Sequence, residues 1–221
     1  MLSGISNLGA TCFINAALQC IRNIPQLQLK KEVDNLVRGR DITPNIIIEL
    51  FDTLNKIQGV KEFIIGKQSC ALDATITMMD VASAHVVDVF KCCRGRYIRN
   101  ITEPWDIIKL SELNVSTTSG EYCTVCENND HVRLNHEFKK ISIITKLNPV
   151  ILIYGISDDI IEVCGIKYEL AAFVIHNGNP YSGHYYCYVK HNGEWYYAND
   201  STVYKSSHVK NNVHFSFYIK I

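Results

Sequence analysis

The chain has 221 residues, of which 47% are hydrophobic and 20% are charged, and these are ordinary values for a globular protein with a core. Its 22 Lys and Arg side chains balance its 22 Asp and Glu side chains, so no overall field attracts nucleic acid or an anionic membrane. No apolar run approaches the length of a membrane span. The composition therefore argues against a nucleic-acid partner and against a membrane partner.

Cysteine is frequent, with nine residues, and the first ten residues, MLSGISNLGA, lack the basic and apolar segments of a secretion signal. A disulfide framework is therefore not expected. We predict reduced thiols in an intracellular compartment, cytoplasmic or nuclear, with some of them serving catalysis or metal binding.

The first part of the chain predicts helices. Apolar residues recur at helical spacing from Ile14 to Ile21, and Pro25 ends this pattern. Residues 45–57 and 69–80 predict two further helices.

Beyond Val86 the pattern changes to short runs that are rich in β-branched and aromatic residues. These runs predict strands at 107–113, 140–144 and 150–156, and in the segments AAFVIHNG, HYYCYVKHNGEWYYA and HFSFYIKI. Between two strands, Asn192-Gly193 predicts a two-residue hairpin turn. Helices followed by a sheet indicate an α+β fold.

Cys12 lies where a glycine-bearing turn gives way to a helical run. The start of a helix offers unpaired N–H groups and a partial positive charge, which lower the pKa of a thiol and favour the thiolate nucleophile. Thr11 is an acceptable N-cap, and Gly9 allows a tight turn before it. The side chain of Asn7 could donate to an oxyanion. From this segment alone, a buried core thiol and a nucleophile both remain open.

A cysteine nucleophile needs a base, usually a histidine that a third polar group orients. His184 follows Gly183 and opens a predicted strand. If Asn192-Gly193 forms the turn, Asn199 of the return strand lies on the face of His184, and a slip of one residue places Asp200 there instead. Either side chain could accept from the imidazole. The alternative is a hydrogen-bonded strand histidine without a chemical role.

Both segments match one known family. GISNLGATCFINAALQ closely resembles the cysteine box of the ubiquitin-specific proteases, and HNGNPYSGHYYCYVKHNGEWYYANDSTV resembles their histidine box. Between these boxes, QSCALDATITMMD resembles the glutamine-led helix of the family and EYCTVCENN resembles its second cysteine pair. The resemblance covers the chain from about Ser3 to Ile221, and two long motifs in the right order make it specific.

The resemblance implies an α+β, papain-like cysteine protease with the right-hand fold of the family. We expect a single domain, 1–221, with a helical thumb over about 1–85 and a β-rich palm with shortened β-fingers over about 86–221. The implied reaction is hydrolysis of the isopeptide or peptide bond after the C-terminal glycine of ubiquitin, through an acyl-enzyme thioester. Ubiquitin or ubiquitinated proteins are the expected partners, and no cofactor is required.

Residue by residue, the resemblance makes Cys12 the nucleophile, His184 its base and Asn199 the third member of the triad. Asp200 is the neighbouring polar residue that assists, and Asn7 matches the asparagine that stabilises the oxyanion. The implied substrate-binding residues are Gln68, Asp73, Gly183 and Tyr185.

The chain departs from the family in its glutamine-led helix. The family carries an Asp and a Glu that grip the basic tail of ubiquitin, and these positions are Cys70 and Asp73 here. Losing one partner of a tail arginine predicts a cost of roughly 1–3 kcal/mol in binding. The modifier could therefore be ubiquitin bound more weakly, or another ubiquitin-like protein. Alternatively, Asp73 is simply a solvated helix residue.

The cysteines of the fingers also depart from the family. Cys123 and Cys126 keep its second CxxC pair, whereas Cys92 and Cys93 are adjacent where the first pair is expected. These four thiols predict either a structural zinc site or a metal-free hairpin that remains in a reduced finger.

Three functions remain open. An active deubiquitinase is favoured because every catalytic position is present. A catalytically weak ubiquitin-binding module and a protease for another ubiquitin-like modifier, or for a Gly-Gly polyprotein site, stay in consideration because a tail-gripping carboxylate is missing. The motifs reach both ends of the chain, so we expect a catalytic core without an appended targeting segment.

Overall fold

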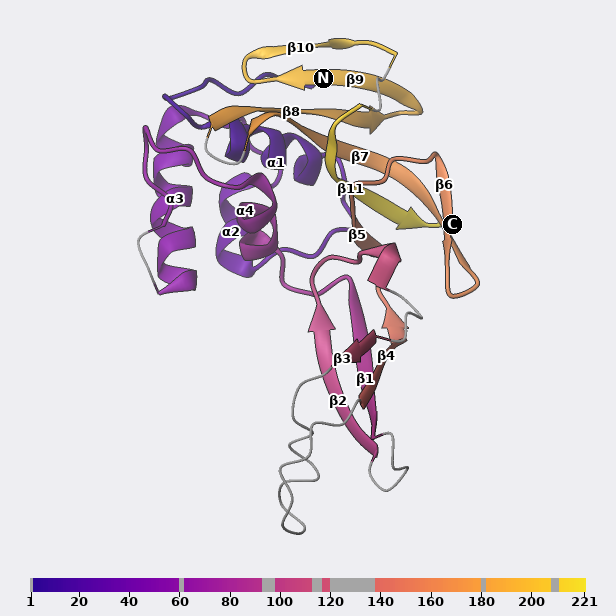
Figure 1. Ribbon diagram of the computed structural model, residues 1–221. Helices are drawn as coiled ribbons and strands as arrows, with labels where there is room; N and C mark the ends of the chain where they lie inside the picture. Colours follow the sequence, from indigo (N-terminus) through magenta and orange to yellow (C-terminus); the bar gives the residue numbers. More distant parts are fainter. Residues whose placement is uncertain are drawn as a thin grey trace. The chain divides into compact units, whose positions relative to one another are not determined.

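The computed structural model describes residues 2–59, 62–92, 98–112, 117–119, 138–179, 182–207 and 211–221. The chain divides into two compact units, Met1–Val81 with Pro149–Ile221 (unit 1) and Ala82–Asn148 (unit 2) (Figure 1). The assignment of residues 1–221 to one domain stays a prediction. Within the described ranges, each helix is too short or too polar to cross a membrane.

The helices of unit 1 all come from the first part of the chain. They are α1 (Cys12–Arg22), α2 (Lys31–Val37), α3 (Pro44–Gln58) and α4 (Ala71–Met78). The sequence predicted α1, α3 and α4, whereas the seven residues of α2 are too few to show a clear period. Thr43 caps α3 by accepting from the N–H of Ile46, and the left-handed Gly59 ends it.

Helix α1 is the centre of unit 1. Every residue from Cys12 to Ile21 is buried, because α1 packs against strand β8 (Ser182–His191) and against α4. A helix covered on several sides has no solvent face, so it can be apolar around most of its circumference. The polar Asn15 and Gln19 are therefore exceptions, and each hydrogen-bonds within the protein.

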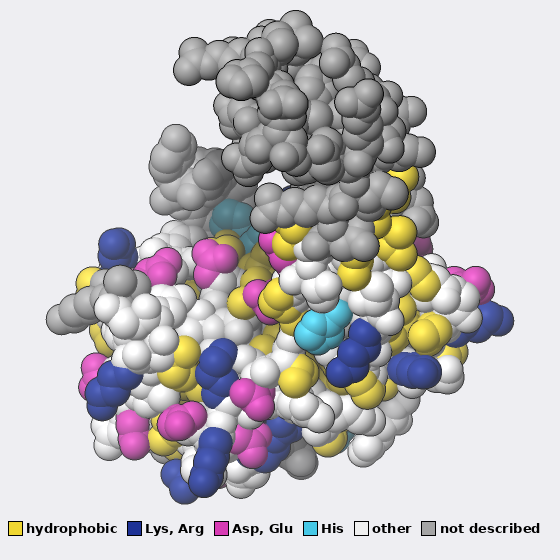
Figure 2. All heavy atoms as spheres, turned by 90° about the horizontal axis from the view of Figure 1, so that it is seen from below, with side chains coloured by type: hydrophobic (Ala, Val, Ile, Leu, Met, Phe, Trp, Pro, Cys, Tyr) yellow, Lys and Arg dark blue, Asp and Glu magenta, His cyan; other side chains and the backbone are white. Residues whose placement is uncertain are grey.

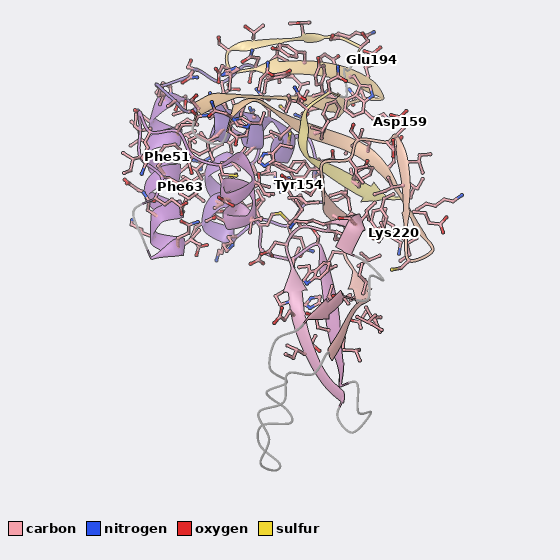
Figure 3. The ribbon with its side chains drawn as sticks, viewed as in Figure 1. Phe51, Phe63, Tyr154, Asp159, Glu194 and Lys220 are labelled. Carbon is pink, nitrogen blue, oxygen red and sulfur yellow. The ribbon has the colours of Figure 1, made fainter. Side chains whose placement is uncertain are left out.

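Three phenylalanines join α1 to α3. Phe13 is fully buried, and its ring centroid lies 5.9 Å from that of Phe51 and 6.2 Å from that of Phe63. Phe51 comes from α3 and Phe63 from the segment that follows it, and their rings lie side by side (Figure 3). This aromatic cluster fixes the helices that carry the N-terminal part of the unit.

The strands of unit 1 form a seven-stranded antiparallel sheet in the order β10-β9-β8-β7-β11-β5, with β6 paired to β7. Their bounds are β5 (Val150–Tyr154), β6 (Ile160–Val163), β7 (Ile166–Asn179), β8 (Ser182–His191), β9 (Glu194–Asn199), β10 (Thr202–Lys205) and β11 (Val213–Lys220). The predicted turn joins β8 to β9, with Asn192 and Gly193 both at positive φ. This turn fixes the register at which His191 faces Glu194.

Unit 2 contains a four-stranded antiparallel sheet in the order β2-β1-β4-β3. Its elements are β1 (Ala84–Cys92), β2 (Ile98–Trp105), the 3-10 helix η1 (Leu110–Glu112), β3 (Thr117–Ser119) and β4 (Phe138–Leu147). The predicted strand at 107–113 is wrong, because its apolar run contains η1 and a single bridging residue, Ile108. A buried hydrogen bond from Ser142 Oγ to Asp88 Oδ1, of 2.6 Å, joins β4 to β1.

The described surface carries charges of both signs. In Figure 2, Lys and Arg side chains are interspersed with Asp and Glu side chains over the face that is shown. This mixture agrees with the equal numbers of basic and acidic residues in the sequence.

The aromatic cluster generates a stability prediction. Phe63→Ala should destabilise unit 1 by about 3–5 kcal/mol, because it leaves a cavity against Phe13 and Phe51. Ile48→Ala is the matched control: this side chain lies on α3 but is 48% exposed, so its loss should change stability by less than about 0.5 kcal/mol. Guanidinium unfolding followed by circular dichroism measures both, and equal effects would contradict the packing described.

Candidate active site

The chain turns sharply just before Cys12, the first residue of α1. Gly9 and Ala10 both have positive φ, and Thr11 follows them at the N-cap position. The hydroxyl of Thr11 does not cap the helix but accepts from the N–H of Leu8 at 2.9 Å. The N–H groups of Phe13 and of Cys12 itself lie near the sulfur of Cys12 and lower its pKa.

The sulfur of Cys12 also reaches strand β8. The backbone N–H of Tyr185, the residue that follows His184, lies near enough to this sulfur to lower the pKa of the thiol. The start of α1 and the start of β8 therefore meet, and two segments far apart in the sequence share one site (Figure 1). A cysteine nucleophile requires a histidine base nearby, and His184 is the residue that precedes Tyr185.

The pKa of the Cys12 thiol is raised in this structure. The sequence-based expectation of a lowered pKa is therefore wrong. Cys12 is 4% exposed, and burial is the largest influence on its pKa, which is raised overall although three nearby N–H groups lower it. The negative charge of Asp200 raises this pKa further. The free protein therefore holds Cys12 mainly as the neutral thiol near neutral pH.

The imidazole of His184 is held by the return strand of the hairpin. The β8–β9 ladder has the predicted register and ends at the pair Cys187 and Ala198. Just beyond it, Asn199 Oδ1 lies 2.7 Å from His184 Nε2 and accepts from that nitrogen when it is protonated. The second ring nitrogen, Nδ1, is then the one that can act as a base.

The carboxylate of Asp200 binds two asparagines of the N-terminal part of the chain. Asp200 has a positive φ of 49°, which turns the chain directly after Asn199. Asn7 Nδ2 donates to its Oδ2 and Asn15 Nδ2 donates to its Oδ1, each at 2.8 Å. The carboxylate thus orients the amide of Asn7, and the one-residue slip that would have aimed Asp200 at His184 does not occur.

The side chain of Asn7 is fixed at its other end as well. Its Oδ1 accepts from the N–H of Gly9 at 3.0 Å and from the N–H of Thr11 at 3.2 Å. These bonds tie Asn7 to the turn that carries Cys12. One hydrogen of Nδ2 goes to Asp200, and the second is the donor that an oxyanion beside Cys12 would use.

The N-terminal segment is clamped between α1 and the turn after β9, a feature that the sequence analysis missed. Gln19 Nε2 donates to the carbonyl of Ser3 at 2.7 Å, and the N–H of Ile5 donates to the carbonyl of Asp200 at 2.8 Å. A Cβ on Gly4 would lie 2.1 Å from the carbonyl oxygen of Ser201, so only glycine fits. The available signal was a pair of polar residues, Asn15 and Gln19, four apart in an otherwise apolar helix.

Gln68 and Gly183 lie together at the start of β8. Gln68 Nε2 donates to the carbonyl of Gly183 at 2.9 Å, and its Oε1 accepts from the N–H of Gly183 at 3.4 Å. A Cβ on Gly183 would lie 2.4 Å from Nε2 of His176. Gln68 and His176 thus confine the backbone that precedes His184.

Comparison with known proteins identifies the family. The sequence matches the profile of the ubiquitin carboxyl-terminal hydrolases over residues 3–79 and 100–218, which is most of the chain. The chain belongs to this family.

Curated relatives resemble the chain over a short stretch. Ubiquitin carboxyl-terminal hydrolase 3 of Homo sapiens and that of Mus musculus are each 54% identical to it over 37 residues. These residues are 16% of this chain and 7% of the length of either relative.

Solved structures resemble the whole chain in fold. The SAGA DUB module Ubp8/Sgf11/Sus1/Sgf73 bound to monoubiquitin contains a chain of 17% identity, with a TM-score of 0.69. The same module bound to ubiquitin aldehyde gives 16% identity and a TM-score of 0.68. All of this chain is covered, against 69% and 70% of those chains. The predicted α+β fold is thereby confirmed.

The position at which the family resemblance places an aspartate is occupied by a thiol at the N-cap of α4. Cys70 occupies the N-cap position of α4, but its side chain makes no capping hydrogen bond. Burial raises the pKa of Cys70 overall, although the nearby N–H groups of Asp73 and Leu72 lower it, so the position is neutral near neutral pH. Burial also raises the pKa of Tyr185, and the nearby thiol of Cys70 raises it further. Asp73 is exposed in the first turn of α4.

The zinc prediction concerns residues that are not described. Cys93, Cys123 and Cys126 lie outside the described residues, as does the side chain of Cys92. In the described part of the chain, no group of three or more His, Cys, Asp or Glu side chains is placed to hold a metal ion. A structural zinc site stays a prediction from the sequence.

The raised pKa of Cys12 generates a prediction about its reactivity. Because the thiolate is the species that reacts, alkylation of Cys12 by iodoacetamide should still accelerate with pH above about 8.5, where an ordinary thiol is half ionised. Mass spectrometry of the Cys12 peptide across about pH 6 to 10 measures this. The exposed Cys164 serves as the internal reference. A plateau of the Cys12 rate below about pH 7 would contradict the prediction.

Proposed function

We propose that the chain is a thiol-dependent deubiquitinase that hydrolyses the isopeptide or peptide bond after the C-terminal glycine of ubiquitin. One observation carries the proposal: α1, which begins at Cys12, packs against β8, and His184 of β8 is hydrogen-bonded to Asn199. The N–H of Tyr185, the residue after His184, lies near enough to Cys12 to lower the pKa of its thiol. Membership of the family and the ubiquitin-bound states of the similar structures support ubiquitin as the partner.

The first half of the reaction acylates Cys12. Nδ1 of His184 takes the thiol proton as the sulfur attacks the glycyl carbonyl carbon, so ionisation accompanies attack and no stable thiolate is needed. Nε2–H donates to Asn199 Oδ1 throughout this step. The oxyanion accepts from Asn7 Nδ2 and from the N–H of Cys12. One such side-chain donor contributes about 2.7–4 kcal/mol to transition-state stabilisation.

The second half of the reaction releases both products. The imidazolium of His184 protonates the lysine nitrogen as its bond to the carbonyl carbon breaks, and the free amine departs. His184 then takes a proton from water, whose oxygen attacks the thioester. The thiolate of Cys12 leaves the carbonyl carbon and recovers a proton from His184, and ubiquitin departs with a free carboxylate.

A protease for another ubiquitin-like modifier is the second candidate. Cys70 places a neutral thiol at the N-cap of α4, where the family resemblance places a carboxylate. A modifier whose tail has fewer basic residues than that of ubiquitin would lose less binding free energy when this carboxylate is absent. The third candidate, a ubiquitin-binding module of weak activity, is also based on the neutral thiol of Cys70.

The test uses ubiquitin that carries an electrophilic vinyl ester at its C-terminus. The wild-type chain should form one covalent adduct by intact mass, and Cys12→Ala should form none. Cys164→Ala is the matched control, because this exposed thiol lies outside the site, and it should react like the wild type. Tight binding without an adduct would favour the binding module. An adduct only with probes of other modifiers would favour the second candidate.

The hydrogen bonds of Asp200 generate a further prediction. Asp200→Asn keeps the size of the side chain but replaces one acceptor of Asn7 and Asn15 by a donor. We expect kcat to fall by about 10²- to 10³-fold, as for Asn7→Ala, because both variants remove the oriented oxyanion donor. Hydrolysis of a ubiquitin–coumarin conjugate measures this. The double variant should lose no more than the worse single variant, and multiplied losses would show that the two residues act independently.

A further inference from the structure

The amide of Asn199 is engaged at both ends. Its Oδ1 faces His184 Nε2 at 2.7 Å, and its Nδ2 donates to the hydroxyl oxygen of Tyr197 at 2.8 Å. Tyr197 lies two residues earlier on β9 and therefore on the same face of the strand. Tyr197, Asn199 and His184 form a continuous row of hydrogen bonds that ends at the imidazole.

The orientation of this amide matters because asparagine has one acceptor end and one donor end. Only the oxygen can accept from Nε2–H and leave Nδ1 of His184 unprotonated for Cys12. If the amide turned over, its NH₂ group would face Nε2, which would then have to be the unprotonated nitrogen. The proton would sit on Nδ1, and the ring could not accept the proton of the thiol.

We propose that Tyr197 is a positioning residue of the reaction: its hydroxyl oxygen binds Nδ2 of Asn199 and keeps the amide oxygen on His184. The proposal rests on the function proposed above. It applies most strongly once His184 carries a positive charge, because both ring nitrogens are then donors and only the observed orientation fits. Donation from Nδ2 to Tyr197 also polarises the amide and strengthens Oδ1 as an acceptor.

The ring of Tyr197 is itself held in place by neighbouring tyrosines. Its centroid lies 5.4 Å from that of Tyr186, 5.4 Å from that of Tyr188 and 5.1 Å from that of Tyr204. Tyr188 is buried and stacks on Phe173 of β7. The hydroxyl of Tyr197 therefore reaches Asn199 from a packed ring, and the bond does not have to order a mobile side chain.

A carboxylate at position 199 would not need this partner. Both of its oxygens accept, so turning it over changes nothing at Nε2. This difference separates an orienting hydroxyl from a merely structural one. Removing the hydroxyl should impair a chain with Asn199 and should matter little in an Asn199→Asp background.

The experiment compares four variants of the whole chain: Tyr197→Phe, Tyr204→Phe, Asn199→Asp, and the combination of Tyr197→Phe with Asn199→Asp. Tyr204→Phe is the matched control, since its ring belongs to the same cluster but is 52% exposed. Steady-state hydrolysis of a ubiquitin–coumarin conjugate gives kcat and KM for each variant. Tyr197→Phe should lower kcat by about three- to tenfold, the effect of one hydrogen bond, with KM nearly unchanged. Tyr204→Phe should change neither.

In the Asn199→Asp background, Tyr197→Phe should change kcat by less than about twofold. An unchanged kcat for Tyr197→Phe beside Asn199 would overturn the proposal. The same loss in both backgrounds would also overturn it, because the hydroxyl would then support the ring cluster and not the amide. Thermal unfolding of each variant confirms that the ring cluster is intact.

A second measurement requires no ubiquitin and separates failure of this inference from failure of the proposed function. Iodoacetamide alkylation of Cys12 at neutral pH reports how well His184 accepts the thiol proton. Tyr197→Phe should slow this alkylation several-fold beside Asn199 and hardly at all beside Asp at position 199. If the wild type does not hydrolyse ubiquitin conjugates but alkylation shows this dependence on residue 199, only the proposed function is contradicted. If the wild type is active but alkylation lacks this dependence, only the inference about Tyr197 is contradicted.

Discussion

The contact between the first turn of α1 and the first residues of β8 is the constraint on which the site depends. The N–H of Tyr185 lies near the sulfur of Cys12, and burial of α1 on several sides leaves little freedom to change that contact. The same packing carries a chemical cost, because a buried thiol beside Asp200 has a raised pKa. A neutral thiol is compatible with catalysis only if a base takes its proton during attack. The hydrogen bonds around His184 therefore matter as much as the position of Cys12.

Two polar side chains after the β8–β9 hairpin serve different partners. Asn199 binds the imidazole, whereas Asp200 turns back through its positive φ and binds Asn7 and Asn15. Asn199 thus holds the base, His184, and its neighbour Asp200 holds the oxyanion donor, Asn7. The neutral Asn199 cannot balance the imidazolium as a carboxylate would, and its amide needs a fixed orientation. The hydroxyl oxygen of Tyr197 accepts from Nδ2 of Asn199 and so favours the orientation in which Oδ1 faces His184.

Local signals predicted much of this arrangement from the sequence. The Asn192-Gly193 turn sets the hairpin register, and the register brings Asn199 to His184. The helical period after Thr11 places Cys12 at the start of α1. What failed depends on contacts between distant segments. The direction of the Cys12 pKa follows from burial by β8 and α4, which no window of sequence reveals. The apolar run at 107–113 resembled a strand, but nothing local distinguishes it from the turn that contains η1. Asp200 could be assigned to Asn7 only after folding had brought residues 7 and 15 beside the end of β9.

The central proposal is that Cys12 and His184 act as one pair, which requires the sulfur and the imidazole to lie within reach of each other in the free protein. A short bifunctional alkylating reagent, 1,3-dibromoacetone, tests it most directly, because its two carbons can bridge a sulfur and a ring nitrogen only when these lie within a few bond lengths. The sulfur displaces one bromide and the imidazole displaces the other. Peptide mapping of the treated wild-type chain should reveal one cross-linked product that joins the Cys12 and His184 peptides, and His184→Ala should yield none. A wild-type product alkylated at Cys12 alone would contradict the account.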